Sequence, residues 1–370
     1  MGKNLYIDAS HPNETRVVLK SGDDIEDYEY EGLKNNLIKN NIYLGKVSRV
    51  EPSLQAAFID FGRERHGFLS FNDIQSDYYQ IPQSDLIKIK EEEEREREEL
   101  LKESENEEQK NINEGNLDEN DPVEVKIESE IELNTPEESI VAESSNEATQ
   151  IIETKKPPQR FRSKRYKIQE VIKPNQVILI QVLKDERGQK GAALSTFISI
   201  AGKYIVLMPN TPKGGGISRK IFNPGERKKI RTILNDITIP KEMGLIVRTA
   251  GSNKTKNDIS HDLQSLIKTW NDIKETALNS IAPSLIHQES DIIKRTLRDM
   301  YDEDTNSIVI EGNDGYKKAQ NFMKLMMPSH VKKIKKYREK VPLFFKENIE
   351  EKLNQIYDTE IKLKSGGYLV

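Results

Sequence analysis

The chain has 370 residues, with 57 Lys and Arg against 62 Asp and Glu, which gives a formal net charge of −5. It contains no cysteine, which excludes a disulfide framework, a thiolate zinc site, an iron–sulfur cluster and a cysteine nucleophile. A mean hydropathy of −0.72 and the lack of an apolar run of about 18 residues argue against a membrane-spanning segment.

The charge is distributed unevenly along the chain. Residues 91–156 hold 24 acids and 7 bases, a local balance of −17, whereas the other 304 residues hold 50 bases and 38 acids, a balance of +12. The acidic segment has no aromatic residue, so it cannot bury enough apolar surface to offset its ordering entropy, and we predict that it is disordered, with a charged helix at its start. The pattern indicates a polyanion-binding body with an acidic insert, which is a spacer, a mask for the basic surface or a partner site.

Short strands dominate the chain before the insert. Residues 4–10 and 16–20 have the pattern of two paired strands, and residues 41–74 read as three strands with two turns. Residues 175–184, after the insert, form another strong strand pattern. We predict one small barrel that the insert interrupts, because a long insertion at a surface loop adds little closure entropy.

The second half of the chain has a mixed pattern. Strand patterns at 197–208, 243–251 and 307–312 alternate with helix patterns at 225–237 and from 289. An apolar stripe from Ile259 to Ala277 predicts a long helix with Trp270 in the core. The basic run 331–340 is typical of a solvated helix face, with RNA contact as the alternative, and residues 344–370 predict one helix and then a strand–turn–strand ending.

Two phenylalanines lie on the polar faces of neighbouring strands. Period-two alternation separates Phe58 from the apolar face of Ala57 and Ile59, and it separates Phe68 from that of Leu69. An exposed aromatic pair in a basic setting is a stacking platform for unpaired bases; the alternative is that both rings pack under a loop. Basic or polar side chains nearby are possible RNA contacts, namely Lys46, Arg65 and His66.

The segment GLIVRTAG indicates an anion site. An apolar strand delivers Arg248 and Thr249 at its tip, and Gly251 permits close backbone approach. A guanidinium offers parallel donors to a phosphate and a hydroxyl adds another; the alternative is an arginine that caps a strand end. The glycine-rich stretch 212–221 is either a flexible basic loop beside this pocket or a plain hairpin turn. Its possible RNA contacts are Lys213, Arg219 and Lys220.

These motifs resemble one known family. YLGKVSRVEPSLQAAFIDFGRERHGFLSFNDI, residues 43–74, is similar to the S1-like RNA-binding barrel of the ribonuclease E/G family. Residues 184–210, 214–221, 244–251 and 285–290 resemble the next segments of that family in its order. The insert within the barrel favours the ribonuclease E form over the shorter ribonuclease G form.

The resemblance assigns roles to single residues. It implies that Lys190 is a basic RNA contact of the barrel beside Phe58 and Phe68. It also implies that Arg248 and Thr249 belong to a pocket that senses a 5′-monophosphate on RNA. Val206 matches the position that supplies a backbone contact to the same terminal group.

The resemblance further implies an α+β multidomain fold. An S1-like (OB-fold) barrel with the acidic insert, residues 35–196, interrupts a degenerate ribonuclease H-like subdomain, residues 1–34 and 294–357. An α/β 5′-sensor subdomain covers residues 197–293, and residues 358–370 would begin a DNase I-like subdomain. The ribonuclease H-like part lacks catalytic acids in the family, so we assign Asp8 no catalytic role.

The implied function is RNA binding and 5′-end sensing within a single-strand-specific endoribonuclease of RNA processing and mRNA decay. Family cleavage uses Mg²⁺ held by two Asp residues that we expect after residue 370, so we predict no catalytic and no metal-binding residue here, and RNA binding without cleavage. The implied partners are single-stranded RNA with a 5′-monophosphate and degradosome-type proteins, not DNA. The intact enzyme would be a homotetramer, cytoplasmic or peripheral at the inner membrane.

The rival reading is a standalone, non-catalytic S1-like RNA-binding protein. The downstream reading frame discriminates between the two, because the enzyme requires an adjacent strand that carries the paired Asp residues.

Overall fold

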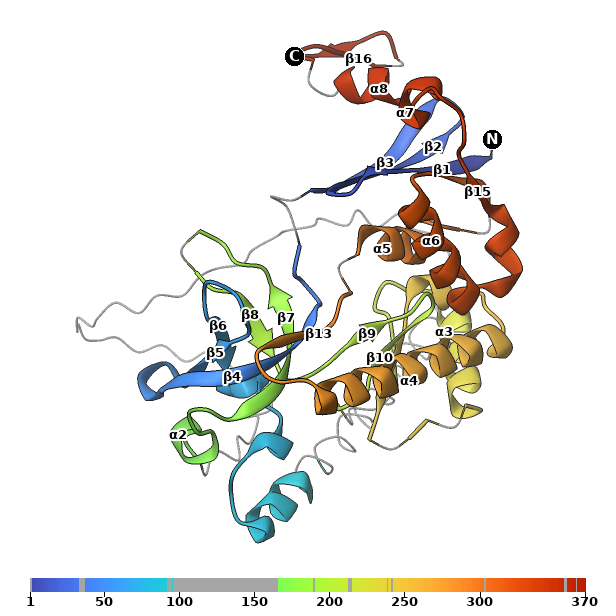
Figure 1. Ribbon diagram of the computed structural model, residues 1–370. Helices are drawn as coiled ribbons and strands as arrows, with labels where there is room; N and C mark the ends of the chain where they lie inside the picture. The colour runs from blue at the N-terminus through green and yellow to red at the C-terminus, as the bar shows by residue number, and fades with distance from the viewer. Residues whose placement is uncertain are drawn as a thin grey trace, which may run out of the picture. The chain divides into compact units, whose positions relative to one another are not determined.

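The computed structural model describes residues 2–32, 37–91, 95, 166–188, 190–211, 215–237, 239–240, 242–289, 291–302, 304–355, 358–363 and 365–370 (Figure 1). The predicted acidic insert therefore lies outside the described residues, apart from residues 91 and 95, which are helical together with residues 83–90. None of the helices in the described ranges combines the length and apolar character that a bilayer crossing requires.

Five strands close a barrel, as the sequence predicts. They are β4 (Ile42–Glu51), β5 (Ala56–Asp60), β6 (Gly67–Ser70), β7 (Val177–Lys184) and β8 (Ala193–Ser195). The order β4-β5-β6-β8-β7 returns to β4, because β7 also pairs with β4. Alternate side chains such as Val47, Ile59 and Leu69 fill the interior and are fully buried. The closed barrel is consistent with an OB-like fold.

Short helical segments accompany the barrel strands. They are η1 (Pro52–Leu54), η2 (Phe71–Asp73), η3 (Ser76–Tyr78) and α2 (Ile168–Val171). The strand β13 (Ser284–His287) arrives from much later in the chain and pairs with the first part of β4. The barrel sheet is therefore extended by a segment that follows the predicted long helix.

A second sheet draws its strands from both ends of the chain, the blue and red segments of Figure 1. Its order is β15-β14-β1-β2-β3; β1 and β2 pair as predicted and are antiparallel, whereas β14 is parallel to β1. The strands are β1 (Lys3–His11), β2 (Glu14–Ser21), β3 (Asp24–Gly32), β14 (Thr305–Glu311) and β15 (Ile334–Lys336).

Both faces of this second sheet are covered. Leu5 and Val17 pack with the helices α5 (Ile292–Asp299) and α6 (Asn313–Met326), whereas Tyr6 and Val18 pack with α7 (Leu343–Lys346) and α8 (Ile349–Gln355). Burial on both faces explains why β1 and β2 read as apolar runs rather than as alternating strands.

A four-stranded sheet carries the GLIVRTAG segment. Its order is β11-β12-β10-β9, and its strands are β9 (Ile200–Ala201), β10 (Ile205–Met208), β11 (Gly215–Ile217) and β12 (Gly244–Val247). The helices α3 (Pro224–Asn235) and α4 (Lys256–Asn279) belong to the same core, and η4 (Thr249–Gly251) follows β12. The apolar stripe of α4 is buried as predicted, and Trp270 is 9% exposed.

Three sequence predictions need correction. Residues 197–208 do not form one strand, because a turn at Gly202 and Lys203 separates β9 from β10. The basic run 331–340 is not a helix face: η5 (Pro328–Lys333) leads into β15, whose pairing with β14 is a tertiary contact invisible in local charge. The predicted helix 344–357 is two helices, because Asn348 adopts a positive φ of 55° between α7 and α8.

The chain ending follows the prediction. The strands β16 (Ile361–Lys362) and β17 (Tyr368–Leu369) form an antiparallel hairpin, and Gly366 has a φ of 88° in its turn. A positive φ at this position favours glycine. The structure also contains β3 and α6, which the sequence did not predict.

Candidate functional site

The two phenylalanines of the barrel are direct cross-strand partners. Phe58 in β5 pairs with Phe68 in β6, and their ring centroids lie 6.0 Å apart at an interplanar angle of 75°. The side chain of Phe68 is 37% exposed, whereas Phe58 is half-buried. The alternation that separates them from Ala57 and Leu69 is confirmed, because both of those residues are fully buried. The edge-to-face pair leaves aromatic surface accessible to a base.

Arg49 completes this aromatic pair, and the sequence analysis missed it. Arg49 pairs with Phe58 across the strands, and its guanidinium carbon lies 4.4 Å from the ring centroid of Phe58. Strict alternation from the buried Val47 would turn Arg49 toward the barrel interior. A register shift between Val47 and Arg49 keeps the arginine on the exposed face instead. Sequence gives no direct signal of such an irregularity.

The structure brings two basic loops together at one end of the pair. Arg65, in the loop between β5 and β6, donates from Nη1 to the carbonyl of Gly188 in the loop between β7 and β8. Lys190 is exposed in that second loop, and His66 is exposed in the first. A Cβ on Gly191 would lie 2.1 Å from the carbonyl oxygen of His66, so only glycine permits this approach.

Lys46 lies further along the same exposed surface. It is exposed in β4 and pairs with Asp60 on one side and Val177 on the other. Arg49 lies three residues after it on the same strand. The predicted barrel residues are therefore all on the outside of the barrel, and cations from β4 and from two strand connections flank the aromatic pair.

The second candidate site lies at the end of β12. The guanidinium of Arg248 donates from Nη1 to the carbonyl of Gly202 at 2.9 Å and from Nη2 to Asp299 Oδ1 at 2.7 Å. Its side chain remains 30% exposed. Thr249 follows it and is exposed at the start of η4. We call Arg248, Thr249 and the turn from Gly202 to Tyr204 the anion pocket.

A buried aspartate on α4 holds the turn of the anion pocket. Asp262 is 6% exposed, and its carboxylate accepts hydrogen bonds from the backbone N–H groups of Lys203, Tyr204 and Ile205 at 3.3, 2.8 and 3.1 Å. A Cβ on Gly202 would lie 2.6 Å from this carboxylate, so the turn requires glycine there. Burial raises the pKa of Asp262, although the three backbone hydrogen bonds oppose that shift.

The turn and η4 then fix the backbone of Arg248. Its N–H donates to the carbonyl of Tyr204 at 2.8 Å. A Cβ on Gly251 would lie 2.9 Å from the same carbonyl oxygen. Gly251 therefore permits close approach between its own backbone and the carbonyl group of Tyr204 within the same chain.

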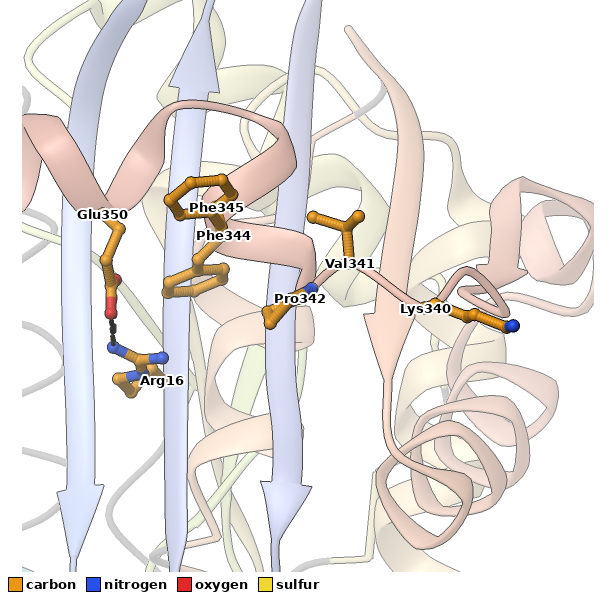
Figure 2. A pocket seen from close by; sticks show the side chains of 7 residues that line it. All are labelled: Arg16, Lys340, Val341, Pro342, Phe344, Phe345 and Glu350. Carbon is orange, nitrogen blue, oxygen red and sulfur yellow. Dashed lines mark hydrogen bonds and ion pairs between the residues drawn. The ribbon is translucent and has the colours of Figure 1, made fainter.

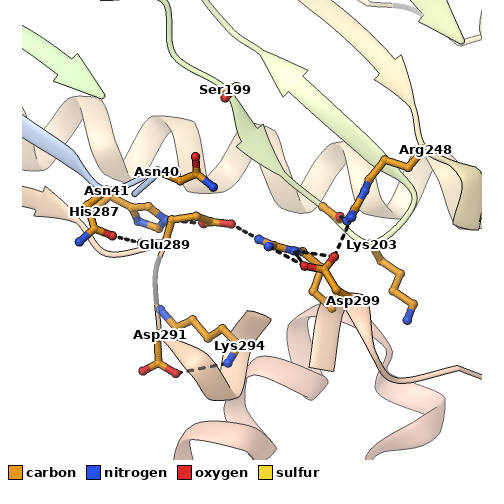
Figure 3. Close-up of polar contacts among 12 residues, drawn as sticks. Asn40, Asn41, Ser199, Lys203, Arg248, His287, Glu289, Asp291, Lys294 and Asp299 are labelled. Atoms are coloured by element: carbon orange, nitrogen blue, oxygen red, sulfur yellow. Dashed lines mark hydrogen bonds and ion pairs between the residues drawn. The ribbon is translucent and has the colours of Figure 1, made fainter. Parts of the chain in front are cut away.

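A row of alternating charges leads away from Arg248 (Figure 3). Asp299 accepts from Arg248 and also from Arg298, whose Nη2 lies 2.9 Å from Asp299 Oδ2. Arg298 donates in turn to Glu289, which lies 3.3 Å from His287 in β13. Burial alone would raise the pKa of Asp299, but the hydrogen bonds and charges of Arg298 and Arg248 hold it below its ordinary value.

Lys203 adds a buried cation to the anion pocket. It is 4% exposed, and its Nζ donates to the carbonyl of Tyr301. Burial lowers the pKa of Lys203 to about 8, although the carboxylates of Asp302 and Asp299 oppose this shift. Sequence analysis missed Lys203, Asp262 and Asp299 because nothing in the local pattern of each residue relates it to Arg248.

The other residues predicted for this region differ in where they lie relative to Arg248. The strand β11 runs parallel to β12, with Ile217 opposite Val247, so the exposed Arg219 and Lys220 follow β11 at the edge where Arg248 follows β12. Val206 lies inside the sheet and pairs with Ile246 on one side and Ala201 on the other. Lys213 lies outside the described residues.

An open hollow of about 500 Å³ lies elsewhere, between β2 and the α7–α8 segment (Figure 2). Its arginine, Arg16, is already paired with Glu350 Oε1 at 3.0 Å and with Asp8 Oδ2 at 2.7 Å, and it lies 4.8 Å from the ring centroid of Phe344. This arginine is neutralised, so the hollow is a poor anion site. Asp8 is paired with this arginine.

The described ranges contain no group of three or more His, Asp or Glu side chains arranged to hold a metal ion. The barrel presents a partly exposed aromatic ring, and the anion pocket presents a partly exposed guanidinium.

Comparison with known proteins finds similarity to one family. Residues 199–370 match the model of the Ribonuclease E/G family. The chain is 33% identical to ribonuclease E of Haemophilus influenzae over 368 residues, which cover all of the chain and 31% of that protein. It is 30% identical over 369 residues to a protein of Buchnera aphidicola subsp. Baizongia pistaciae that is provisionally described as ribonuclease E, of which it spans 71%.

A more distant relative is ribonuclease G of Salmonella typhimurium. The identity is 24% over 359 residues, which cover 97% of the chain and 58% of that protein. The chain therefore spans less than a third of the Haemophilus protein and more than half of the ribonuclease G.

Proposed function

The chain belongs to the ribonuclease E/G family, a family of endoribonucleases, and from this premise we propose that it supplies RNA binding and 5′-end recognition. The single observation that carries the proposal is Arg248, a partly exposed guanidinium held in place at a strand end with donors left over. The order of the second sheet, three antiparallel strands followed by two parallel ones, also supports a ribonuclease H-like subdomain built from both ends.

The anion pocket can distinguish RNA 5′ ends by charge. A terminal phosphate carries about −1.5 to −2 charges near pH 7, whereas a 5′-hydroxyl carries none. Arg248 supplies charge-assisted hydrogen bonds to such a group. The hydroxyl of Thr249 is exposed next to it and has no hydrogen-bond partner among the described residues. Lys203 adds positive charge below its pKa of about 8.

The barrel face binds the rest of a single strand. A base that stacks on Phe68 gains about 1–3 kcal/mol whatever its identity. Arg49, Lys46, Arg65 and Lys190 are placed to contact backbone phosphates around the aromatic pair. Because these contacts release counterions, affinity should fall steeply with salt.

The described residues contain no group of three or more His, Asp or Glu side chains arranged to hold a metal ion, and we assign no metal-dependent step to them. We propose that Mg²⁺ ligands and strand cleavage lie in other parts of the intact enzyme. Homotetramer assembly, degradosome-type partners and a cytoplasmic or inner-membrane location are carried over from the family as proposals only.

The test compares binding of one single-stranded RNA with either a 5′-monophosphate or a 5′-hydroxyl. The wild-type chain should prefer the monophosphate. Arg248→Ala should abolish this preference, a loss of about tenfold or more, because a hydrogen bond to a charged group is worth roughly 1.5–3 kcal/mol. Binding of the 5′-hydroxyl RNA should hardly change.

Arg219→Ala is the matched control, since it removes an exposed arginine from the neighbouring strand end. It should weaken both RNAs slightly and alike. An equal loss for both RNAs in Arg248→Ala would contradict the sensor assignment.

A further inference from the structure

The orientation of Arg248 is set by two acceptors from distant parts of the chain. Gly202 lies 46 residues before it and Asp299 lies 51 residues after it. A guanidinium has five N–H donors, and among the described residues these two hydrogen bonds are the ones that the side chain makes. Three donors are therefore left for a ligand on a side chain that is 30% exposed.

Asp299 is itself held rigidly. Arg298 donates from Nε to Asp299 Oδ1 at 3.2 Å and from Nη2 to Oδ2 at 2.9 Å. The side chain of Arg298 is 9% exposed and is also paired with Glu289. Both oxygens of the carboxylate that contacts Arg248 therefore also accept hydrogen bonds from the buried guanidinium of Arg298.

We propose that Asp299 is the positioning residue of the anion pocket, so that recognition of a 5′-phosphate depends on a carboxylate from α5. This rests on the function proposed above. Binding a phosphate with a freely rotating arginine costs the free energy of immobilising that side chain. A guanidinium that is already held by Gly202 and Asp299 avoids much of this cost and presents its remaining donors in a fixed fork.

Charge alone predicts the opposite effect. Removing the Asp299 carboxylate takes one negative charge away from the pocket, so the net charge of the pocket becomes more positive. Any anion would then be attracted more strongly. Orientation and charge therefore predict changes of opposite sign in the preference for a 5′-monophosphate. This difference in sign makes the proposal testable.

The experiment measures fluorescence anisotropy of the same RNA, with a 5′-monophosphate or a 5′-hydroxyl, bound to the wild-type chain and to Asp299→Asn at one salt concentration. The asparagine keeps the size and one acceptor oxygen and removes the charge. We expect the ratio of the two affinities to fall about tenfold, while 5′-hydroxyl RNA binds within about twofold of wild type. An unchanged or larger ratio would overturn the proposal.

Two further variants test whether the expected fall comes from the lost orientation of Arg248 or from a general loosening of α5. Glu29→Gln removes a similar ion pair of the same helix, since Arg295 Nη2 lies 2.8 Å from Glu29 Oε2 and the Glu29 side chain is 30% exposed against 32% for Asp299. It should leave the ratio unchanged; an equal fall in Glu29→Gln would overturn the proposal by showing that any loosening of α5 suffices.

Asp299→Glu keeps the charge on a longer side chain. It should retain more of the preference than Asp299→Asn, and it serves if the asparagine variant folds poorly in a thermal melt. Equal loss in both would contradict orientation by the carboxylate. A wild-type chain without any 5′-monophosphate preference would instead overturn the proposed function itself.

Discussion

The barrel face and the anion pocket differ in how far apart along the chain their parts lie. Phe58 and Phe68 belong to neighbouring strands joined by one short loop, and Arg49 is one strand away. The pocket instead gathers the turn at Gly202, the strand end at Arg248 and the helix end at Asp299. A local hairpin can be read from alternation, whereas a pocket of this kind is assembled by the whole fold.

The two regions also differ in their coupling to stability. The barrel aromatics are exposed or half-buried and make few polar contacts, so a change there should alter binding and little else. The pocket depends on buried charges, Asp262 at 6% exposure and Lys203 at 4%. Changes there should alter the folding free energy as well as recognition, because a buried polar group without its partner is costly.

The strongest test of this contrast is Asp262→Ala. It leaves the buried N–H groups of Lys203, Tyr204 and Ile205 without their acceptor. At about 1–3 kcal/mol for each unsatisfied group, we expect a loss of about 3 kcal/mol or more in unfolding free energy, measured by urea denaturation. Asp272→Ala, an exposed position of the same helix, is the control and should change stability little. A loss below about 1 kcal/mol would show that the turn does not depend on this carboxylate.

The next test uses the pH dependence of stability. Lys203 has a pKa of about 8 in the folded chain against 10.5 in its unperturbed state, so between these values the unfolded chain binds a proton that the folded chain does not. Stability therefore rises with pH across this window, and below pH 8 the cost of the buried charge is fully present.

Lys203→Met isolates this effect. The unfolding free energy of the wild-type chain relative to this variant should increase by up to about 3 kcal/mol between pH 8 and 10.5. Guanidinium or urea melts at several pH values measure it. A difference that stays flat would mean that Lys203 titrates as an ordinary surface lysine.

The smallest expected effect concerns the barrel face. Phe58→Ala and Phe68→Ala should each weaken RNA binding by about 1–3 kcal/mol, equally for 5′-monophosphate and 5′-hydroxyl RNA, because stacking does not sense the terminal charge. Tyr30→Ala is the control, since Tyr30 is 44% exposed on β3. A selective loss for one of the two RNAs would show that the barrel face also takes part in recognising the 5′ end, which contradicts separate roles for the two regions.

Much of the fold could be predicted from the sequence. The interrupted barrel, α4 and the final hairpin follow from alternation, helical spacing and turn residues, and the first strand pair follows from two short apolar runs, because these features depend on near neighbours. The break at Asn348 and the strand β15 could not be predicted. Asn348 interrupts an otherwise helical pattern through its backbone conformation, and β15 is defined by its pairing with β14.

The candidate sites divide in the same way. The sequence determined that a basic body carries an acidic segment, that an aromatic pair lies on a polar strand face, and that an arginine ends an apolar strand. Tertiary structure alone decided that Arg49 joins the aromatic pair, that Asp299 contacts Arg248, and that Asp262 and the buried Lys203 meet in the turn beside it. The physical reason is that periodicity records which face a residue occupies, whereas hydrogen bonds between distant segments depend on how the faces of different elements meet.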